Sequence, residues 1–338
     1  MLIFFTFSIL TIIVSKKILF AGVDGGSTKT FTVLADGEGH IVGTGETGPS
    51  NYHVVGVEKA IENIYESILI AAKRIDFSYE IEAITLGLAG MDTKYDFQFF
   101  EKNVAGKLPA KKIYVRHDAE IALVGATGGK PGIIVIAGTG SAAGGRNRKG
   151  KYLRCGGWGY ILGDEGSAYY LGKRALMAVL WAYDGRGEKT ILRDLVIEKM
   201  NIKDEEDIIR KVYVEKMTVK DIAALAPLVT QAALKNDKVA LQIFKDAAKH
   251  LALHVIALVK RLEMEDEEEI LVATIGGVWK AGDIILNPFK EELEKHFNVK
   301  VIKPMFPPAV GALLISYMFN GIEINNTLLD NIRKTLKE

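Results

Sequence analysis

The sequence predicts an α/β protein of two domains built on mixed β-sheets. The chain has 338 residues, which exceeds the roughly 250–300 residues at which one hydrophobic core stops growing. Short apolar runs typical of strands alternate with segments whose apolar residues have helical spacing. A unit of strand, glycine-rich turn and strand occurs once in each half of the chain. This favours an internal duplication over a solenoid, whose period is about 20–50 residues.

In the first half, an apolar run at 18–23 enters a glycine turn and a second run begins at 31–34. Strand, turn and strand is the interpretation that fits this pattern. The remaining elements expected here are a helix over 56–75, strands over 84–88 and 113–115, and a helix over 119–126.

In the second half, the apolar run 133–137 enters another glycine turn, and a strand-like stretch then reaches the turn 147–150. Helices dominate from there, because the apolar residues have helical spacing. We expect helices over 167–183, 225–234 and 239–262, and a strand over 270–275 that ends at Gly276 and Gly277.

Composition excludes several classes of protein. Lys+Arg number 43 and Asp+Glu 42, which leaves a formal charge of +1 and no strongly basic block. A protein that binds nucleic-acid phosphates needs a basic patch, so we expect no nucleic-acid partner. The lone cysteine, Cys155, excludes an intrachain disulfide framework and an iron–sulfur cluster held by one chain.

Residues 1–15 are uncharged and mostly apolar, and the basic pair Lys16-Lys17 follows them. A spanning helix needs about 20 such residues, and a secretory signal carries its charges before the apolar run. A short membrane anchor, a poorly formed signal and a translation start placed too far upstream are the three interpretations, and we favour the third. We therefore treat 1–17 as an extension outside the fold and expect no membrane partner.

Three glycine-rich turns leave predicted strands, at 24–30, 138–141 and 276–279. Glycine lets backbone N–H groups surround phosphate oxygens because no Cβ blocks the approach. A plain tight turn is the alternative for any one of them. Two better-known phosphate motifs fail: 125–130 has the wrong spacing for a P-loop, and 138–144 does not open a helix, as a dinucleotide fingerprint must.

Two aspartates are candidates for chemistry. Asp24 lies in the first glycine turn, where its carboxylate could hold Mg²⁺ together with nucleotide phosphates, or could only stabilise the turn. Asp118 lies between a predicted strand and a predicted helix. It could accept a proton from a substrate hydroxyl, or serve only as a helix N-cap.

The segment 155–170, CGGWGYILGDEGSAYY, is rich in glycine around Trp158 and Asp164. A packed strand or helix does not tolerate so many glycines, so we expect a loop. Carboxylates that bind hydroxyl groups and an aromatic face that covers carbon suit a polyol, whereas a structural loop around a buried Trp is the alternative. His53, His117 and His250 show no metal-ligand spacing, and we expect structural or surface roles for them.

Taken in order, the motifs VDGGSTKT, PSNYH, LGLAG, HDAEIA, IAGTGS, CGGWGYILGDEGSAYY and IGGVWKAG resemble the N-acetylglucosamine kinase and BadF/BadG/BcrA/BcrD ATPase branch of the sugar kinase/heat-shock 70/actin superfamily. The resemblance runs from about residue 18 to beyond residue 311. It implies two ribonuclease-H-like domains of the actin-like ATPase type with the active site in the cleft between them. The expected bounds are 18–127 for a small domain, with the helix 321–338 packing back on it, and 128–320 for a large domain.

The resemblance also implies roles for individual residues. Asp24 would serve Mg²⁺ and Asp118 would be the general base. The remaining positions implied for ATP are Gly25, Gly26, Ser27, Thr28, Lys29, Gly138, Thr139, Gly140, Ser141, Gly276, Gly277 and Trp279. Those implied for the sugar are Asn51, Asp118, Gly157, Trp158 and Asp164. Ala142 departs from the family pattern, because eukaryotic N-acetylglucosamine kinases carry a sugar-contacting Asn there.

The function implied is transfer of a phosphoryl group from MgATP to the 6-hydroxyl of N-acetylglucosamine or a related amino sugar. A broad-specificity hexokinase or glucosamine kinase is the alternative, and a non-catalytic sugar sensor is another. A BadF-type activator of a reductase would need two cysteines per chain for a shared cluster, and this chain has one. We expect a cytoplasmic homodimer that acts on a small-molecule sugar.

Overall fold

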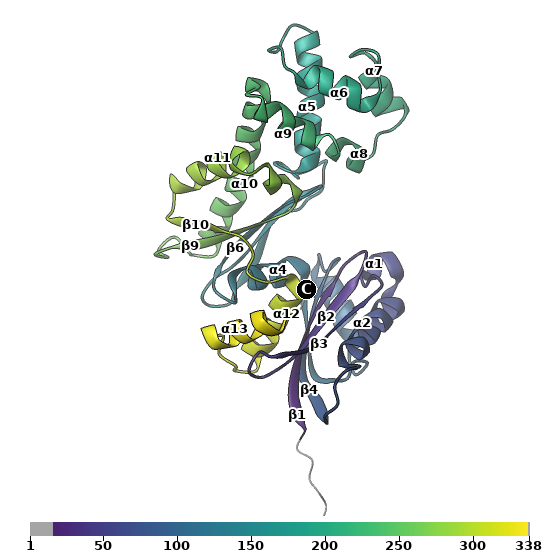
Figure 1. The fold of residues 1–338 in the computed structure, drawn as a ribbon, viewed down its shortest axis with the longest axis vertical. Helices are drawn as coiled ribbons and strands as arrows, with labels where there is room; N and C mark the ends of the chain where they lie inside the picture. The colour runs from purple at the N-terminus through teal and green to yellow at the C-terminus, as the bar shows by residue number, and fades with distance from the viewer. Residues whose placement is uncertain (1–15, 337–338) are drawn as a thin grey trace, which may run out of the picture. The chain divides into compact units, whose positions relative to one another are not determined.

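The computed structural model describes residues 16–336, so the extension predicted over 1–15 lies outside the described residues. The described chain forms two compact units (Figure 1). Among the described residues, unit 1 contains 16–118 and 312–336, and unit 2 is Ala119–Gly311. Across residues 16–336, no helix has both the length and the apolar character needed to cross a membrane.

Within the described residues, unit 1 is built on one five-stranded sheet in the order β3-β2-β1-β4-β5. β1, β2 and β3 form an antiparallel meander, whereas β4 and β5 run parallel to β1. The strands are β1 Lys17–Gly25, β2 Thr30–Asp36, β3 Ile41–Thr47, β4 Tyr79–Leu88 and β5 Ala110–His117. The helices are α1 Tyr52–Val55, α2 Val57–Ala72, α3 Lys94–Val104, α12 Pro308–Phe319 and α13 Asn326–Thr335, with α12 entering this unit at Ala312.

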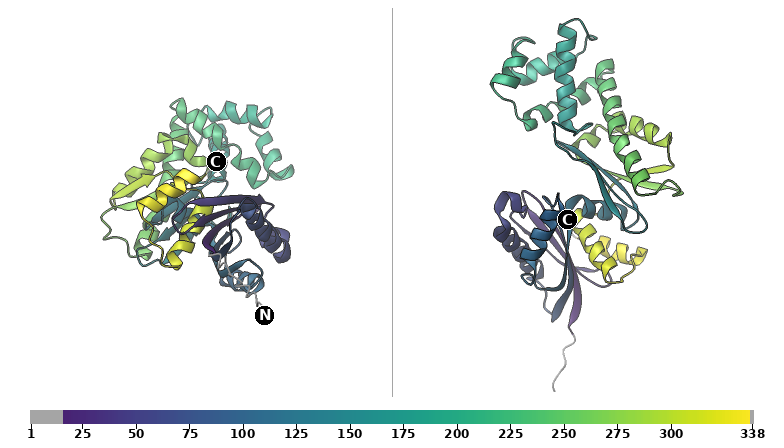
Figure 2. Two further views of the ribbon diagram at one scale, coloured as in Figure 1. Left: turned by 60° about the horizontal axis from the view of Figure 1, so that its bottom comes forward. Right: turned by 180° about the vertical axis from the view of Figure 1, so that it is seen from behind.

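The helix α2 packs on β2 and β3 because it has one apolar face and β3 carries glycine where the helix approaches. It buries Ile61, Ile64 and Ile68, which recur at the spacing of one helix face. On β3, a Cβ added at Gly43 would lie 1.8 Å from the carbonyl oxygen of Ala71 at the end of α2. Glycine therefore lets the helix lie directly against the sheet. From behind, Figure 2 shows the C-terminal helices in yellow beside this sheet.

Unit 2 repeats the same topology with the order β10-β9-β6-β7-β8. β6, β7 and β8 are antiparallel, and β9 and β10 run parallel to β6. The strands are β6 Gly132–Ala137, β7 Ser141–Arg146, β8 Tyr152–Gly156, β9 Ile270–Ile275 and β10 Val299–Ile302. The predicted α/β class with two mixed sheets is confirmed, and the shared topology is what an internal duplication produces.

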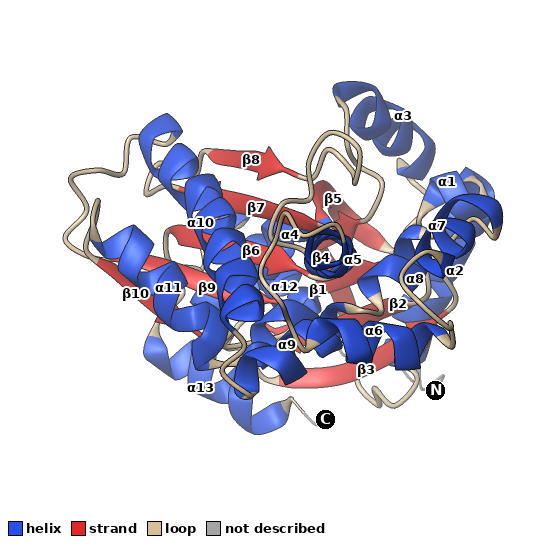
Figure 3. Cartoon of the chain, turned by 90° about the horizontal axis from the view of Figure 1, so that it is seen from above, coloured by secondary structure: helices blue, strands red, loops and turns tan. Residues whose placement is uncertain are grey.

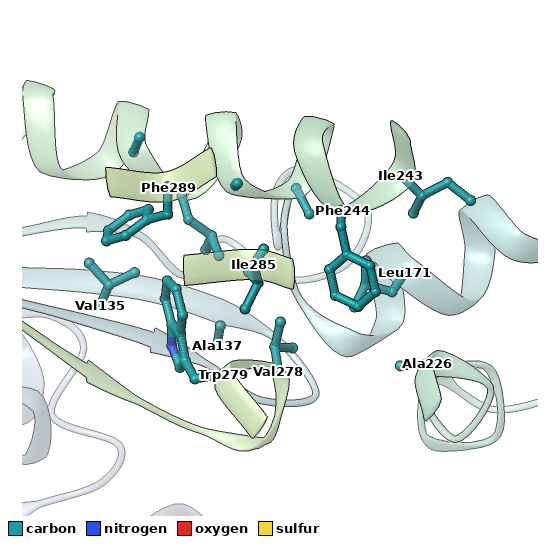
Figure 4. Close-up of a cluster of buried hydrophobic side chains, with 14 of the residues drawn as sticks. Val135, Ala137, Leu171, Ala226, Ile243, Phe244, Val278, Trp279, Ile285 and Phe289 are labelled. Carbon is teal, nitrogen blue, oxygen red and sulfur yellow. The ribbon is translucent and has the colours of Figure 1, made fainter. Parts of the chain in front are cut away.

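The helices of unit 2 are more numerous than those of unit 1. They are α4 Asp118–Thr127, α5 Ala168–Tyr183, α6 Leu192–Met200, α7 Asp207–Ile209, the π-helical turn η1 Arg210–Val214, α8 Val219–Ala223, α9 Ala226–Leu234, α10 Lys238–Arg261, the 3₁₀ turn η2 Gly277–Ala281 and α11 Asp283–Glu294. Figure 3 shows α10 lying along the sheet beside β6 and β7. The core between them includes Val135, Phe244 and Phe289 (Figure 4).

Both boundaries between the units lie earlier in the chain than those expected at 127/128 and 320/321. At the second, Ser316 on α12 is already part of unit 1, because its hydroxyl donates to the carbonyl of Ala21 and bonds the hydroxyl of Thr85, each at 2.8 Å. At the first, α4 belongs with unit 2, because the carbonyl of Gly125 accepts from the N–H of Phe306 at 3.1 Å. These contacts join segments far apart in sequence, so local patterns do not reveal them.

Candidate functional site

The carboxyl ends of β1, β4 and β5 lie at one edge of the unit 1 sheet. Strand pairing sets Asp24 opposite Gly87 and, one residue further along β4, Leu88 opposite His117. The chain then enters α4 at Asp118. The end of β1 and the end of β5 therefore meet at the same edge, although the sequence separates them widely. Parallel strands place functional groups together in this way at their carboxyl ends.

The turn between β1 and β2 depends on Gly25. A Cβ at this position would lie 2.2 Å from the Oγ of Ser50, so only glycine permits this approach. The N–H of Gly26 donates to the carbonyl of Lys29 at 2.9 Å and closes the hairpin. Ser27, Thr28 and Lys29 are exposed at its tip, as a loop that binds phosphate requires.

Asp24 is half-buried at the base of this turn. Its burial and the negative charge of Asp118 raise the pKa of the carboxyl group to about 6, and the positive charge of Lys29 opposes this only in part. A bound cation would remove the cost of the ionised form. Oxygen ligands of this kind suit Mg²⁺, which binds through one or two carboxylates and the phosphates of a substrate.

Asp118 contacts a residue for which the sequence predicted no such role. The Nδ1 atom of His117 lies 2.7 Å from the Oδ1 atom of Asp118, and its Nε2 atom lies 3.6 Å from the Oδ1 atom of Asp92. The Asp118 side chain is 43% exposed, whereas that of His117 is 14% exposed. His117 thus lies beside the predicted base, and the surface or structural role expected for it is incomplete.

Asn51 and Lys29 already have partners in unit 1. The Asn51 amide donates to the Oγ of Ser27 at 3.0 Å, and its oxygen accepts from the N–H of His53 at the start of α1. Lys29 pairs with Glu46 at 2.7 Å, with both side chains more than half exposed. Such an exposed pair is worth little, so Lys29 can exchange it for a phosphate at small cost. Asp24–Lys29, Asn51, His117 and Asp118 together are called the unit 1 site.

In unit 2, the turn between β6 and β7 rests on the start of α5. The carbonyl of Gly138 accepts from the N–H of Ala168 at 2.8 Å, and that of Thr139 accepts from the N–H of Tyr169 at 3.2 Å. Thr139 itself is exposed. Ser167, which the sequence placed at the start of this helix, caps it by accepting from the N–H of Tyr170.

Asp164 supports this second turn. Its Oδ1 atom accepts from the N–H of Ser141 at 3.0 Å. A Cβ at Gly140 would lie 2.8 Å from the same carboxylate, so a larger residue there would displace it. Asp164 has a φ of 63°, a left-handed conformation that is uncommon outside glycine and is often found at functional sites. The sequence predicted a sugar contact for Asp164, and this link to the glycine turn was missed.

The loop after β8 presents Trp158 with 71% of its surface exposed, so the alternative of a buried Trp is wrong. Gly157 precedes it with a φ of 74°, and a Cβ there would lie 3.2 Å from the Cβ of Ala142. Its N–H donates to the carbonyl of Ser141 at 3.0 Å. The loop, Ala142 and the second glycine turn are therefore neighbours, and the Nη2 atom of Arg154 would lie 3.9 Å from the Cβ added at Gly157.

The third turn follows β9. Gly276 has a φ of 116°, and a Cβ there would lie 2.3 Å from the carbonyl oxygen of Ala137, whereas Gly277 has open space around it. Trp279 is only 8% exposed and packs edge-on against Phe289, with 4.9 Å between ring centroids (Figure 4). The ring of Trp279 belongs to the core, so the exposed backbone of the two glycines is the part of this turn that a ligand can reach.

A cavity of about 500 Å³ adjoins this third turn and was not predicted from the sequence. It lies among the start of α5, the segment from α8 to α9, and η2. Its lining is mostly small and apolar, with Thr230, Gln231 and Lys280 as polar members. The run of alanines in 223–226 is the only sequence signal for it, because small side chains leave room for a flat ring. Gly138–Ser141, Gly157, Trp158, Asp164, Gly276, Gly277 and this cavity are called the unit 2 site.

The comparisons with known proteins agree with this geometry. The sequence profile of the BadF/BadG/BcrA/BcrD ATPase family matches residues 21–316. The N-acetylmuramic acid/N-acetylglucosamine kinase of Clostridium acetobutylicum is 37% identical over 297 residues, which cover 87% of this chain and 97% of the relative. The N-acetyl-D-glucosamine kinase of Dictyostelium discoideum is 34% identical, over 89% of this chain and 98% of the relative.

Among solved structures, a candidate N-acetylglucosamine kinase from Chromobacterium violaceum matches with a TM-score of 0.65 and 28% identity, over 89% of this chain and 99% of that one. The family predicted from the motifs and the fold class predicted with it are both confirmed.

Proposed function

Because the chain belongs to the BadF/BadG/BcrA/BcrD ATPase family, we propose that it is an ATP-dependent kinase that phosphorylates the 6-hydroxyl of N-acetylglucosamine or a related amino sugar. The observation that carries the proposal is at the carboxyl edge of the unit 1 sheet. There a glycine turn with an exposed tip meets two carboxylates, Asp24 and Asp118, in different surroundings. Phosphoryl transfer needs a group that binds a metal ion and a separate group that accepts a proton.

We assign each part of the ATP molecule to a group of residues in one of the two units. The cavity beside Gly277 has about 500 Å³ and an apolar lining, which suits a purine base. The exposed backbone at Thr139 and Gly277, and the tip at Ser27 and Thr28, supply N–H groups for phosphate oxygens. We assign Lys29 to the same phosphates, since its ion pair with Glu46 is exposed and can be exchanged at small cost.

Asp24 is the residue that would hold Mg²⁺. A half-buried carboxylate with a raised pKa and a second carboxylate nearby forms an electronegative site whose charge a cation would balance. When bound, Mg²⁺ would neutralise part of the charge on the ATP phosphates. The neighbouring turn keeps Asp24 in place, because Gly25 contacts Ser50 and Leu88 too closely to allow a Cβ.

Asp118 is assigned as the general base. Its side chain is 43% exposed, so a substrate hydroxyl can reach it. It would accept the proton of the 6-hydroxyl as the sugar oxygen attacks the γ-phosphorus of ATP, while the bond from that phosphorus to the bridging oxygen breaks and ADP leaves. Positioning and electrostatics then carry most of the rate, since phosphoryl transfer asks little covalent chemistry of the protein.

The sugar contacts remain predictions for Asn51, Gly157, Trp158 and Asp164. The exposed ring of Trp158 supports one of them, because an aromatic face can cover the carbon side of a sugar. Gly157 and Ala142 are close neighbours without polar side chains, which suits an acetyl methyl group. A broad-specificity hexokinase or glucosamine kinase is the alternative, since Ala142 supplies no side-chain hydrogen bond.

The activator alternative is disfavoured on chemical grounds. A cluster shared by two subunits needs two thiolates from each, and the sequence holds Cys155 alone. This thiol is half-buried, and burial raises its pKa, which opposes the thiolate form that binds iron. A cytoplasmic location, where ATP is available, and a homodimer complete the proposal. Light scattering of the purified protein tests the dimer.

An assay of ADP release with MgATP and a panel of hexoses tests the function. We expect turnover with N-acetylglucosamine well above that with glucose. The Asp118→Asn variant should lose at least about 100-fold in kcat, the usual size of a general-base effect. Equal rates with every hexose would favour the hexokinase alternative, and ADP release that ignores all sugars would exclude a sugar kinase.

A further inference from the structure

His117 lies between two carboxylates at the edge of the unit 1 sheet. Its Nδ1 atom is 2.7 Å from the Oδ1 atom of Asp118, and its Nε2 atom is 3.6 Å from the Oδ1 atom of Asp92. As the last residue of β5, His117 is paired with Leu88 at the end of β4, and Asp92 follows on the loop after that strand. The side chain is 14% exposed, so its ring has little freedom to leave.

We propose that His117 is a positioning residue that holds the Asp118 carboxylate in the orientation needed to accept a proton from the acceptor hydroxyl. The inference rests on the proposed function, because it concerns the same base. It adds a role for His117 that its motif, HDAEIA, did not indicate.

The chemistry of the contact fixes the direction of the hydrogen bond. An ionised carboxylate only accepts, so the Nδ1 atom of His117 must carry the hydrogen and donate to the Oδ1 atom of Asp118. A charge-assisted bond of this kind is among the stronger hydrogen bonds. It engages the Oδ1 atom of Asp118 and so restricts the orientation of the carboxylate.

Orientation matters here because Asp118 is 43% exposed. An exposed Asp side chain samples several rotamers, and only those that direct an oxygen at the acceptor hydroxyl are productive. Misplacement of a catalytic group by about 1 Å can cost on the order of 100-fold in rate. Asp92 lies on the far side of the ring, with its Oδ1 atom 3.6 Å from the Nε2 atom of His117.

The test compares kcat and KM of the whole protein for N-acetylglucosamine and three substitutions at one position. His117→Ala should lower kcat about 10-fold or more and change KM for the sugar by less than about 3-fold, because the base is misplaced and not removed. His117→Asn places an amide N–H where Nδ1 lies and should recover most of the rate. His117→Gln places its amide nearer to the position of Nε2 and should not.

Two further measurements separate positioning from a structural role. In the Asp118→Asn background, His117→Ala should cause no further loss beyond about 2-fold, since residues that act through one another are not additive. The matched control is His40→Ala, which removes another histidine bonded to an aspartate, Asp36, through Nδ1 at 3.1 Å. This control should keep the wild-type rate. Thermal unfolding of each variant checks that it is folded.

Normal kcat in folded His117→Ala would overturn the inference, as would equal rates for the Asn and Gln variants or a full additional loss in the Asp118→Asn background. If the wild-type protein shows sugar-dependent turnover in these experiments, the proposed function survives that result and the role of His117 alone fails. Absence of sugar-dependent turnover in the wild-type protein would overturn both.

Discussion

Replacing Asp24 with asparagine is expected to stabilise the metal-free protein and to abolish phosphoryl transfer. Burial and the charge of Asp118 raise the pKa of Asp24 from its ordinary value of 3.8 to about 6. That difference corresponds to about 3 kcal/mol of cost for the ionised form above pH 6. The attraction to Lys29 is already included in that pKa, so asparagine avoids this cost but buries an amide. We therefore expect a net gain of about 1–3 kcal/mol in the free energy of unfolding.

The pH dependence of this gain has a definite sign. The folded wild-type protein holds the Asp24 proton more tightly than the unfolded chain does, so its stability falls as pH rises from about 4 to about 6. The Asn variant lacks this term. Its advantage should therefore be absent below about pH 4, grow between about 4 and 6, and remain constant above.

Thermal unfolding in EDTA at several pH values between 4 and 7 measures the effect. A gain of this size should raise Tm by several degrees at pH 7. The matched control is Asp76→Asn, an exposed aspartate whose replacement should change stability by less than about 0.5 kcal/mol. With MgATP and sugar, Asp24→Asn should lose at least about 100-fold in kcat. Equal Tm values for the variant and the wild-type protein at pH 7, or the same gain at pH 4, would refute the reasoning.

Three other outcomes can be measured with the same protein. Calorimetry with a nonhydrolysable ATP analogue measures the apparent affinity for Mg²⁺, which should fall about 10-fold per pH unit below about 6 because a proton then competes for Asp24. An affinity that does not vary between pH 5 and 7 would remove Asp24 from the metal site. Gly276→Ala should cost at least about 2 kcal/mol of stability, because the φ of Gly276 is 116° and its Cβ would meet the carbonyl of Ala137. Gly277→Ala should cost little, and similar Tm values for the two variants would contradict the close approach of Gly276 to Ala137. Ala224→Trp fills the cavity beside η2 from an exposed position. It should raise KM for ATP about 10-fold or more and leave KM for the sugar nearly unchanged. An unaltered KM for ATP would place the purine base elsewhere.

The parts of the fold that the sequence predicted well are those with local patterns. The strand over 270–275 matches β9 in full, and Ser167 begins the helix α5 as expected. By contrast, the strands predicted over 84–88 and 113–115 are longer in the structure, as β4 and β5. The charged residues Glu80, Glu82, Lys111 and Lys112 hid these extensions, because they pair across the two strands at the exposed end of the sheet.

In the candidate site, too, the residues with a local sequence signal were predicted and those that depend on distant contacts were not. Gly25 and Gly140 were found because a position where another group approaches the backbone closely requires glycine, which is visible in the sequence. The structure shows these close groups, Ser50 at Gly25 and Asp164 at Gly140. The role of His117 was missed although it precedes Asp118 directly. Its contacts with Asp118 and Asp92 depend on side-chain rotamers and on the path of the loop after β4, which a local motif does not show. The cavity beside η2 joins segments more than forty positions apart, so no local motif reports it. The resemblance assigned Trp279 to ATP, and the structure shows its ring packed on Phe289.

Identification of the product tests the central claim most directly. After incubation with MgATP and N-acetylglucosamine, phosphorus NMR should show one new sugar phosphate, with its phosphorus coupled to the two protons on carbon 6, in amounts equal to the ADP formed. Formation of free phosphate in place of a sugar phosphate, or attachment at another hydroxyl, would contradict transfer to the 6-hydroxyl with Asp118 as the base.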